Sequence, residues 1–162
     1  MQRTIGRVLA VIGITMFMAA LAQADDKAPW GTASLDPIDY APQKVVYDVA
    51  EGDPERFERI IDRVSFLNNV YQADPFEASI VLVLHGDEIR FFATENYAEY
   101  GELMRRAQSL TLAGPIQFRM CRVAAHTRGF EPGDIHGFVK MVPMADAEII
   151  RLQHEEGHVF MQ

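Results

Sequence analysis

One almost entirely apolar run, Ala78 to Leu84 (ASIVLVL), constrains the fold of this chain more than any other stretch. A run of this length, rich in Val, Ile and Leu, is typical of a β-strand that is buried on both of its faces. Such a strand needs hydrophobic cover on both sides, and in α/β proteins helices supply that cover. The run therefore predicts a strand inside a layered α/β domain.

Strand-like and helix-like segments alternate along the rest of the chain. Further strands are predicted at 44–49, 116–120, 137–142 and 158–161, and helices at 54–72, 97–110, 121–128 and 143–156. Residues 88–93 are predicted to be a short extended piece or a loop. Because strands that alternate with helices are joined by right-handed crossovers, we expect a three-layer α/β/α domain with a mostly parallel sheet of about five strands. Periodicity alone does not predict the strand order.

The first 24 residues are typical of a secretory signal peptide. Arg3 and Arg7 precede an apolar run from Val8 to Leu21, and Ala22-Gln23-Ala24 matches a small-x-small cleavage site. The alternative is an uncleaved N-terminal anchor, although the run is short for a membrane span, which needs about 20 residues. We expect export to the periplasm with cleavage after Ala24, an extended leader over 25–43 and one folded domain over 44–162.

The composition excludes several classes of partner. The chain carries a net charge of -8 at pH 7, so it has no excess positive charge with which to bind nucleic acid or an anionic membrane. It contains neither a glycine-rich phosphate loop nor a Gly-x-Ser-x-Gly nucleophile motif. We therefore predict no nucleic-acid partner, no membrane association once the signal is cleaved, and no bound cofactor.

The segment from His154 to His158, HEEGH, matches the H-E-x-x-H pattern of helical zinc sites. In such sites both histidines lie on one face of a helix and a third ligand completes the coordination. Here Gly157 interrupts the pattern, and glycine commonly follows the last residue of a helix. We therefore expect His154 near the end of a helix, His158 at the start of a strand, and no metal site.

The single cysteine, Cys121, is the strongest candidate for a reactive residue. It is predicted to lie where the third strand ends and a helix begins, and backbone N–H groups at a helix N-terminus favour the thiolate form. Arg119, two residues earlier on a strand, should share a face with Cys121, while Arg122 and His126 are near it in sequence. The alternative is a buried and unreactive thiol, as most free cysteines are.

Polar residues also follow the first two predicted strands. His85 comes directly after the apolar run, and ligands bind parallel sheets in the crevice at the carboxyl ends of the strands. The alternative is that His85 only caps the strand and bonds to local backbone. Asp48, Glu51 and Asp53 are expected to form a loop and a helix cap. We predict that the rim of a pocket at Cys121 includes His85, Arg119, Arg122 and His126.

Several segments together resemble a known family. Residues 121–129, CRVAAHTRG, are similar to the active-site segment of the DsrE/DsrF/TusD-like (DsrE) family, in which a cysteine opens a short helix and small residues and an Arg-Gly pair follow. Three further segments resemble the exported branch of that family: KVVYDVAEGDPERF, LVLHGDEIRFF and KMVPMADAEIIRLQHEEG. The resemblance covers 44–160, nearly the whole predicted domain.

The resemblance implies an α/β/α domain that forms homo-oligomers, often trimers or hexamers. It also implies that Cys121 carries sulfur as a persulfide in a relay, so that the protein would be a sulfur carrier or sulfurtransferase-like protein with an unidentified sulfur donor and acceptor. An oligomer is further expected because Phe91, Phe92 and Tyr100 are large apolar residues on a small domain. The alternative is a non-catalytic oligomeric binding or scaffold domain in which Cys121 is only packed.

Overall fold

The computed structural model describes residues 30–112 and 114–162. The predicted signal peptide lies outside these residues. The chain divides into two units, Met1–Ile38 and Asp39–Gln162. The described part of the first unit, 30–38, is exposed and contains no helix or strand. Within the described ranges no helix is long and apolar enough to cross a membrane.

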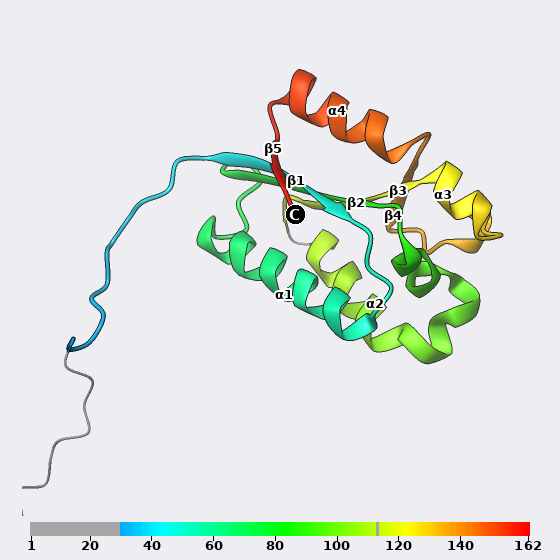
Figure 1. The fold of residues 1–162 in the computed structure, drawn as a ribbon, viewed down its shortest axis with the longest axis horizontal. Coiled ribbons are helices and arrows are strands. Elements are labelled where there is room, and N and C mark those ends of the chain that lie inside the picture. The colour runs from blue at the N-terminus through cyan, green and yellow to red at the C-terminus, as the bar shows by residue number, and fades with distance from the viewer. Residues whose placement is uncertain (1–29, 113) are drawn as a thin grey trace, which may run out of the picture. The chain divides into compact units, whose positions relative to one another are not determined.

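The second unit is built on a five-stranded sheet with the order β4-β3-β2-β1-β5 (Figure 1). Every neighbouring pair of strands is parallel. The strands are β1 (Gln43–Val49), β2 (Ala78–Leu84), β3 (Ile116–Cys121), β4 (Val139–Val142) and β5 (Val159–Met161). The apolar run that predicted a doubly buried strand is β2, the central strand.

Helices cover both faces of the sheet. Figure 1 shows α1 and α2 on one face and α4 on the other, with α3 beside the end of β3. Their bounds are α1 (Pro54–Val70), α2 (Tyr97–Leu112), α3 (Arg122–Thr127) and α4 (Ala145–Glu156). The predicted three-layer α/β/α fold with five strands is therefore confirmed, and the sheet is parallel throughout.

Residues of β2 alternate between two apolar clusters. Ile80, Leu82 and Leu84 pack into the larger cluster, with side chains of α1 and α2. Val81 and Val83 pack into a smaller cluster on the opposite face, together with Ile149 of α4. All five of these β2 side chains are at most 1% exposed, so the strand is covered on both faces as its composition requires.

Two capping residues fix where α1 begins and where α4 ends. The Asp53 carboxylate accepts hydrogen bonds from the backbone N–H groups of Glu55 and Arg56, at 2.9 and 3.2 Å, and so caps the start of α1. Gly157 ends α4 with a φ of 76°, a left-handed conformation that is strained for residues with a Cβ. The caps expected at these two positions are confirmed.

The segment after β2 differs from its prediction. Residues 88–93 were expected to be extended or a loop, but Asp87–Phe92 forms a 3-10 helix, η1. Its side chains Ile89, Phe91 and Phe92 are fully buried in the cluster under α1 and α2. This spacing fits neither alternation nor a complete helical turn pattern, which is why periodicity did not identify it. Two further short 3-10 helices are η2 (Thr94–Asn96) and η3 (Pro132–Asp134).

An ion-pair network fastens α4 to the sheet. The Glu148 carboxylate of α4 accepts hydrogen bonds from Arg119 of β3 and from Arg151 one turn further along α4. The side chains of Arg119 and Glu148 are only 13% and 10% exposed. Hydrogen bonding from Arg151, assisted by Arg119, holds the pKa of Glu148 below its usual value of 4.5 despite burial.

Replacing Glu148 should therefore destabilise the fold in a pH-dependent way. Glu148→Gln leaves Arg119 buried without a counter-charge and should lower the free energy of unfolding at pH 7 by about 2–3 kcal/mol. Because the folded-state pKa of Glu148 is depressed, its contribution is complete above pH 4.5 and is lost as the pH falls through the folded-state value. Urea unfolding of both proteins from pH 7 to pH 3 should show the difference shrinking below about pH 4.5. A constant difference across this range would contradict the assignment.

Candidate functional site at the carboxyl edge of the sheet

All strands of a parallel sheet end at the same edge, and the connections decide where that edge opens. After β3 the chain enters α3, whose Ala125 packs into the cluster on the α1 and α2 face. After β4 it enters α4, whose Ala145 packs on the opposite face. The chain thus leaves these neighbouring strands toward opposite faces, which is the kind of position where open α/β sheets bind ligands.

Cys121 lies at this position. It is the last residue of β3 and the N-cap of α3, one residue from where the sequence pattern ended the strand. Its Sγ accepts a hydrogen bond from the backbone N–H of Ala124 at 3.4 Å. The residue is 4% exposed and packs in the cluster on the α4 face with Val83 and Ile149. The thiol is therefore at the expected strand end but beneath the surface.

His85, the residue after β2, is held by Asp48 of β1. The distance from His85 Nε2 to Asp48 Oδ1 is 2.5 Å, and both side chains are about one-third exposed, at 30% and 29%. Nε2 is the ring nitrogen in this contact, and Nδ1 lies outside it. His85 thus does more than cap its strand, and Asp48, expected only as part of a loop, proves to be its partner.

The register of the sheet places Cys121 and His85 at the ends of adjacent strands. Leu84 of β2 is opposite Met120 of β3, and His85 and Cys121 are the residues that follow them. Cys121 packs on the α4 face together with Val83 and Val46. By alternation, His85 and Asp48 share the face of Val83 and Val46, and their hydrogen bond is consistent with this. A thiol, an imidazole and a carboxylate thus occupy one face of three adjacent strands.

The turn after His85 is rigidly built. The carboxylate of Glu88, which is fully buried, accepts hydrogen bonds from the backbone N–H groups of Gly86 and Glu51, both at 2.8 Å. Burial raises the pKa of Glu88 above its usual 4.5, and these hydrogen bonds oppose that shift. A Cβ at Gly86 would lie 2.5 Å from the Cα of Ala50, so only glycine permits this approach of the two loops. His85 is thus carried on a fixed backbone.

A pocket opens beside α3, next to Cys121 in the chain. Its volume is about 370 Å³, and it is lined by Arg122, Val123, His126, Thr127, Glu131 and Pro143. Two of the four residues predicted for a pocket rim, Arg122 and His126, line it, whereas His85 and Arg119 do not. His126 is exposed, and its Nδ1 is 2.7 Å from the Glu131 carboxylate. We refer to this cavity as the α3 pocket.

Arg119 and Arg122 differ in how they can act on the thiol. Arg119 lies toward α4, on the face of Cys121, as the strand pattern predicted. Its guanidinium is, however, paired with Glu148, which neutralises most of the positive potential it would supply to Cys121. Arg122 is exposed and, within the described residues, has no ion-pair partner. The cation available to an incoming anionic group at this edge is therefore Arg122.

The HEEGH segment does not form a helical zinc motif. The helix ends at Glu156, between the two histidines, as the glycine predicted. His158 is 4% exposed, with Nδ1 3.2 Å from the Leu152 carbonyl oxygen and Nε2 3.1 Å from Ser79 Oγ. Burial lowers the pKa of His158 below 6.5, so the ring is neutral near pH 7. Both of its nitrogens are engaged in hydrogen bonds within the fold. Across the described part of the chain, no three His, Cys, Asp or Glu side chains are grouped to hold a metal ion.

Comparison with known proteins supports the fold but not a function. No family model matches the chain, and no curated protein sequence matches it. Among solved structures, the chain is similar to MTH1491, a protein of unknown function from Methanobacterium thermoautotrophicum. The two share 21% sequence identity with a TM-score of 0.61, over 74% of this chain and 97% of that one. This similarity shows a shared fold.

The geometry of HEEGH leads to a simple expectation for zinc. Protein purified without a histidine tag should contain no stoichiometric zinc, because His158 is already bonded through both ring nitrogens and His154 lies on a different element. Elemental analysis of the purified protein and of His154→Ala would measure this. One zinc per chain that is lost in the variant would overturn the structural role assigned to His158.

Proposed function

We propose that the protein is a sulfur carrier that holds a persulfide on Cys121 and acts in the periplasm after export. The observation that carries the proposal is the alignment of Cys121, His85 and Asp48 on one face of three adjacent strands at the carboxyl edge. The sequence resemblance to the DsrE family supports the same role for the cysteine. The N-terminal signal pattern supports the location.

The chemistry requires a thiolate and a proton acceptor. In this proposal His85 Nδ1 takes the proton of the Cys121 thiol, and Asp48 holds the ring and stabilises the imidazolium that forms. The thiolate attacks the terminal sulfur of a donor persulfide, forming a new S–S bond while the donor S–S bond breaks. The donor leaves as a thiolate and is reprotonated, so no oxidant or reductant is consumed.

Access to the thiol decides between this function and a second one. Cys121 is only 4% exposed, so a donor reaches it only when the segment around α3 opens. In this proposal the donor enters through the α3 pocket, because Arg122, which lines that pocket, directly follows Cys121 in the sequence. The burial itself favours the second candidate, a non-catalytic oligomeric binding or scaffold domain in which the thiol fills the space under α4.

Sulfur uptake separates the two candidates. Native protein treated with inorganic polysulfide should gain the mass of one sulfur atom per chain, and dithiothreitol should remove it. Cys121→Ser should gain nothing while retaining the circular dichroism and melting temperature of the native protein. If native protein takes up no sulfur, and iodoacetamide modifies Cys121 only after denaturation, the scaffold candidate replaces the carrier.

The same assay tests the role of His85. His85→Gln should slow sulfur uptake at pH 7 by about 100-fold, the low end of the usual contribution of a general base. Asp48→Asn should slow it less, because the ring remains but loses its orientation. His154→Gln is the matched control, since His154 is an exposed histidine of α4 that does not line the α3 pocket. Equal rates for all three variants would exclude His85 as the base and leave the carrier proposal standing.

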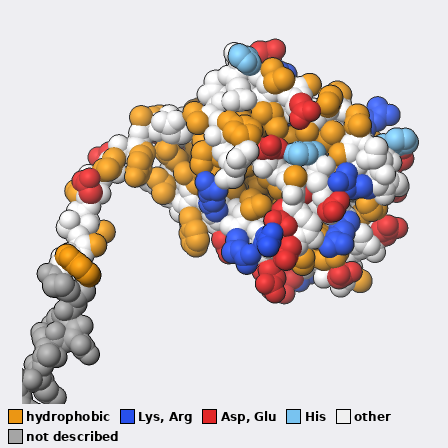
Figure 2. Space-filling model, in the orientation of Figure 1, with side chains coloured by type: hydrophobic (Ala, Val, Ile, Leu, Met, Phe, Trp, Pro, Cys, Tyr) orange, Lys and Arg blue, Asp and Glu red, His pale blue; other side chains and the backbone are white. Residues whose placement is uncertain are grey.

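We also propose that the protein forms a homo-oligomer, a trimer or hexamer as the resemblance implies. The residues first expected to form its surface do not: Phe91 and Phe92 are fully buried, and Tyr100 packs against that cluster. A different apolar surface lies at the β5 edge of the sheet, where Val159 and Phe160 are 53% and 37% exposed. Figure 2 views this edge and shows apolar side chains over it, with charged side chains gathered below.

Burial of this edge in an assembly predicts a concentration-dependent mass. Light scattering at micromolar concentration should give at least three times the mass of one chain, which is 18.3 kDa before the signal peptide is removed. Val159→Lys should shift the mass toward the monomer, because a lysine at an edge strand opposes association. Phe76→Lys, at an exposed apolar residue outside the sheet, is the control and should leave the mass unchanged. A monomeric native protein would count against the oligomer.

A further inference from the structure

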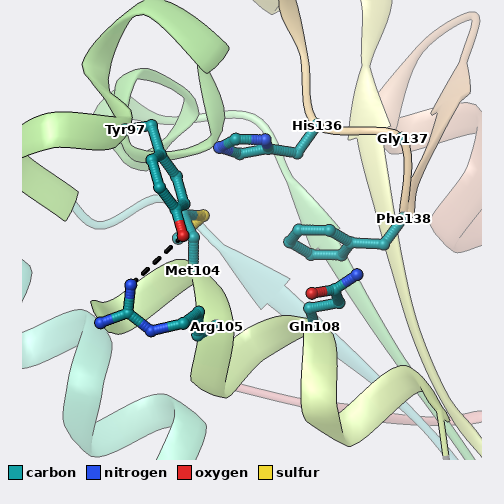
Figure 3. Close-up of a pocket in the computed structure, with 7 residues that line it drawn as sticks. All are labelled: Tyr97, Met104, Arg105, Gln108, His136, Gly137 and Phe138. Carbon is teal, nitrogen blue, oxygen red and sulfur yellow. Dashed lines mark hydrogen bonds between the residues drawn. The ribbon is translucent and has the colours of Figure 1, made fainter. Parts of the chain in front are cut away.

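A second pocket lies on the α1 and α2 face, apart from Cys121. Its volume is about 340 Å³, and it opens between α2 and the segment that leads into β4 (Figure 3). Helix α2 contributes Tyr97, Met104, Arg105 and Gln108, and the other wall is formed by His136, Gly137 and Phe138. We call it the α2–β4 pocket. None of the residues discussed for sulfur transfer lines it, so its role is a separate question.

The walls of this pocket are aromatic. The rings of His136 and Phe138 are stacked, with centroids 6.0 Å apart and an angle of 13° between the planes. Tyr97 meets the His136 ring edge-on, at 5.6 Å and 76°. The backbone N–H of His136 donates a hydrogen bond to the Phe92 carbonyl oxygen at 3.0 Å, which fixes the segment that leads into β4 to η1. These rings bound a narrow space whose shape suits a flat group.

The same pocket contains a buried polar atom, Nε2 of His136, that forms no hydrogen bond within the described residues. In Figure 3 the His136 ring extends from its wall toward Tyr97. Burial lowers the pKa of His136 below 6.5, so the ring is neutral near pH 7 and adds no charge to the pocket. A neutral imidazole nitrogen without a partner favours a ligand that supplies a hydrogen bond.

Arg105 gives the pocket its charge. Its neighbour Arg106 points to α1, where it is paired with Glu58 and Asp62. Arg105 instead donates to the Tyr97 hydroxyl at 3.2 Å and has no carboxylate partner within the described chain. In the close-up the amide of Gln108 lies next to the Phe138 ring (Figure 3). The pocket thus presents one uncompensated guanidinium and an amide, a donor set that recognises a carboxylate.

We propose that the α2–β4 pocket binds a small planar monoanion, an aromatic carboxylate, with the carboxylate on Arg105 and the ring between the Tyr97 and Phe138 walls. One positive charge in the pocket matches one negative charge on the ligand. The volume is at the low end for small-molecule sites, which restricts the ligand to about one ring with its substituents. Binding here does not depend on sulfur transfer at Cys121.

Calorimetric titration of the full-length protein with benzoate tests the proposal. Benzoate should bind saturably with one site per chain and a Kd of roughly 1 mM or tighter, as expected for a ligand of this size. Benzamide, which keeps the ring and loses the charge, should bind at least about tenfold more weakly. Cyclohexanecarboxylate, which keeps the charge and loses the flat ring, should also bind more weakly.

Two arginine variants locate the site. Arg105→Gln should weaken benzoate binding by at least about tenfold, whereas Arg59→Gln, at an exposed arginine of α1, should bind as the native protein does. Both variants should melt as the native protein does, because neither arginine forms an ion pair within the described chain. The proposal is overturned by the absence of saturable benzoate binding, by equal affinity for benzoate and benzamide, or by equal effects of the two variants.

Discussion

The whole arrangement depends on burying the central strand on both faces. β2 presents Leu82 and Leu84 to one layer and Val81 and Val83 to the other, and each of these side chains is completely buried. The first layer comes from nearby segments of the chain, because α1 precedes β2 and α2 follows it after two short 3-10 helices. The second layer is supplied from far away, since α4 must return across the sheet from β4. The Arg119–Glu148 pair holds that returning helix on the sheet.

The placement of α1 and α2 on one face and α4 on the other also determines the geometry of the carboxyl edge. Because α1 and α2 follow from neighbouring strands and α4 from an outer one, the chain leaves β3 and β4 in opposite directions. Cys121 lies at that divergence, His85 follows the adjacent strand β2, and Asp48 of β1 bonds to His85. These three residues come from three separate segments of the sequence. Their association results from strand order and alternation, in which each adjacent strand contributes one polar residue to the same face.

Much of the fold could be predicted from the sequence because it is encoded locally. The apolar run of β2, the Asp53 cap and Gly157 each act on the residues next to them in sequence. The elements that they predict are present. The Asp48–His85 bond and the pairing of Arg119 with Glu148 join residues 37 and 29 positions apart, and the strand order also depends on distant residues, which no local pattern specifies. For the same reason Phe91 and Phe92 looked like surface residues and are core.

The position of β5 has a consequence for how the chain folds during synthesis. β5 pairs with β1, the first strand, although it follows every other element in the chain. α4, which covers Val46 and Val81, also comes late. An emerging chain that has completed α1, β2 and α2 can therefore close one face of the sheet while the other stays uncovered. The apolar face beneath α4 is exposed longest, so a pause or truncation before residue 145 leaves a sheet with one bare side.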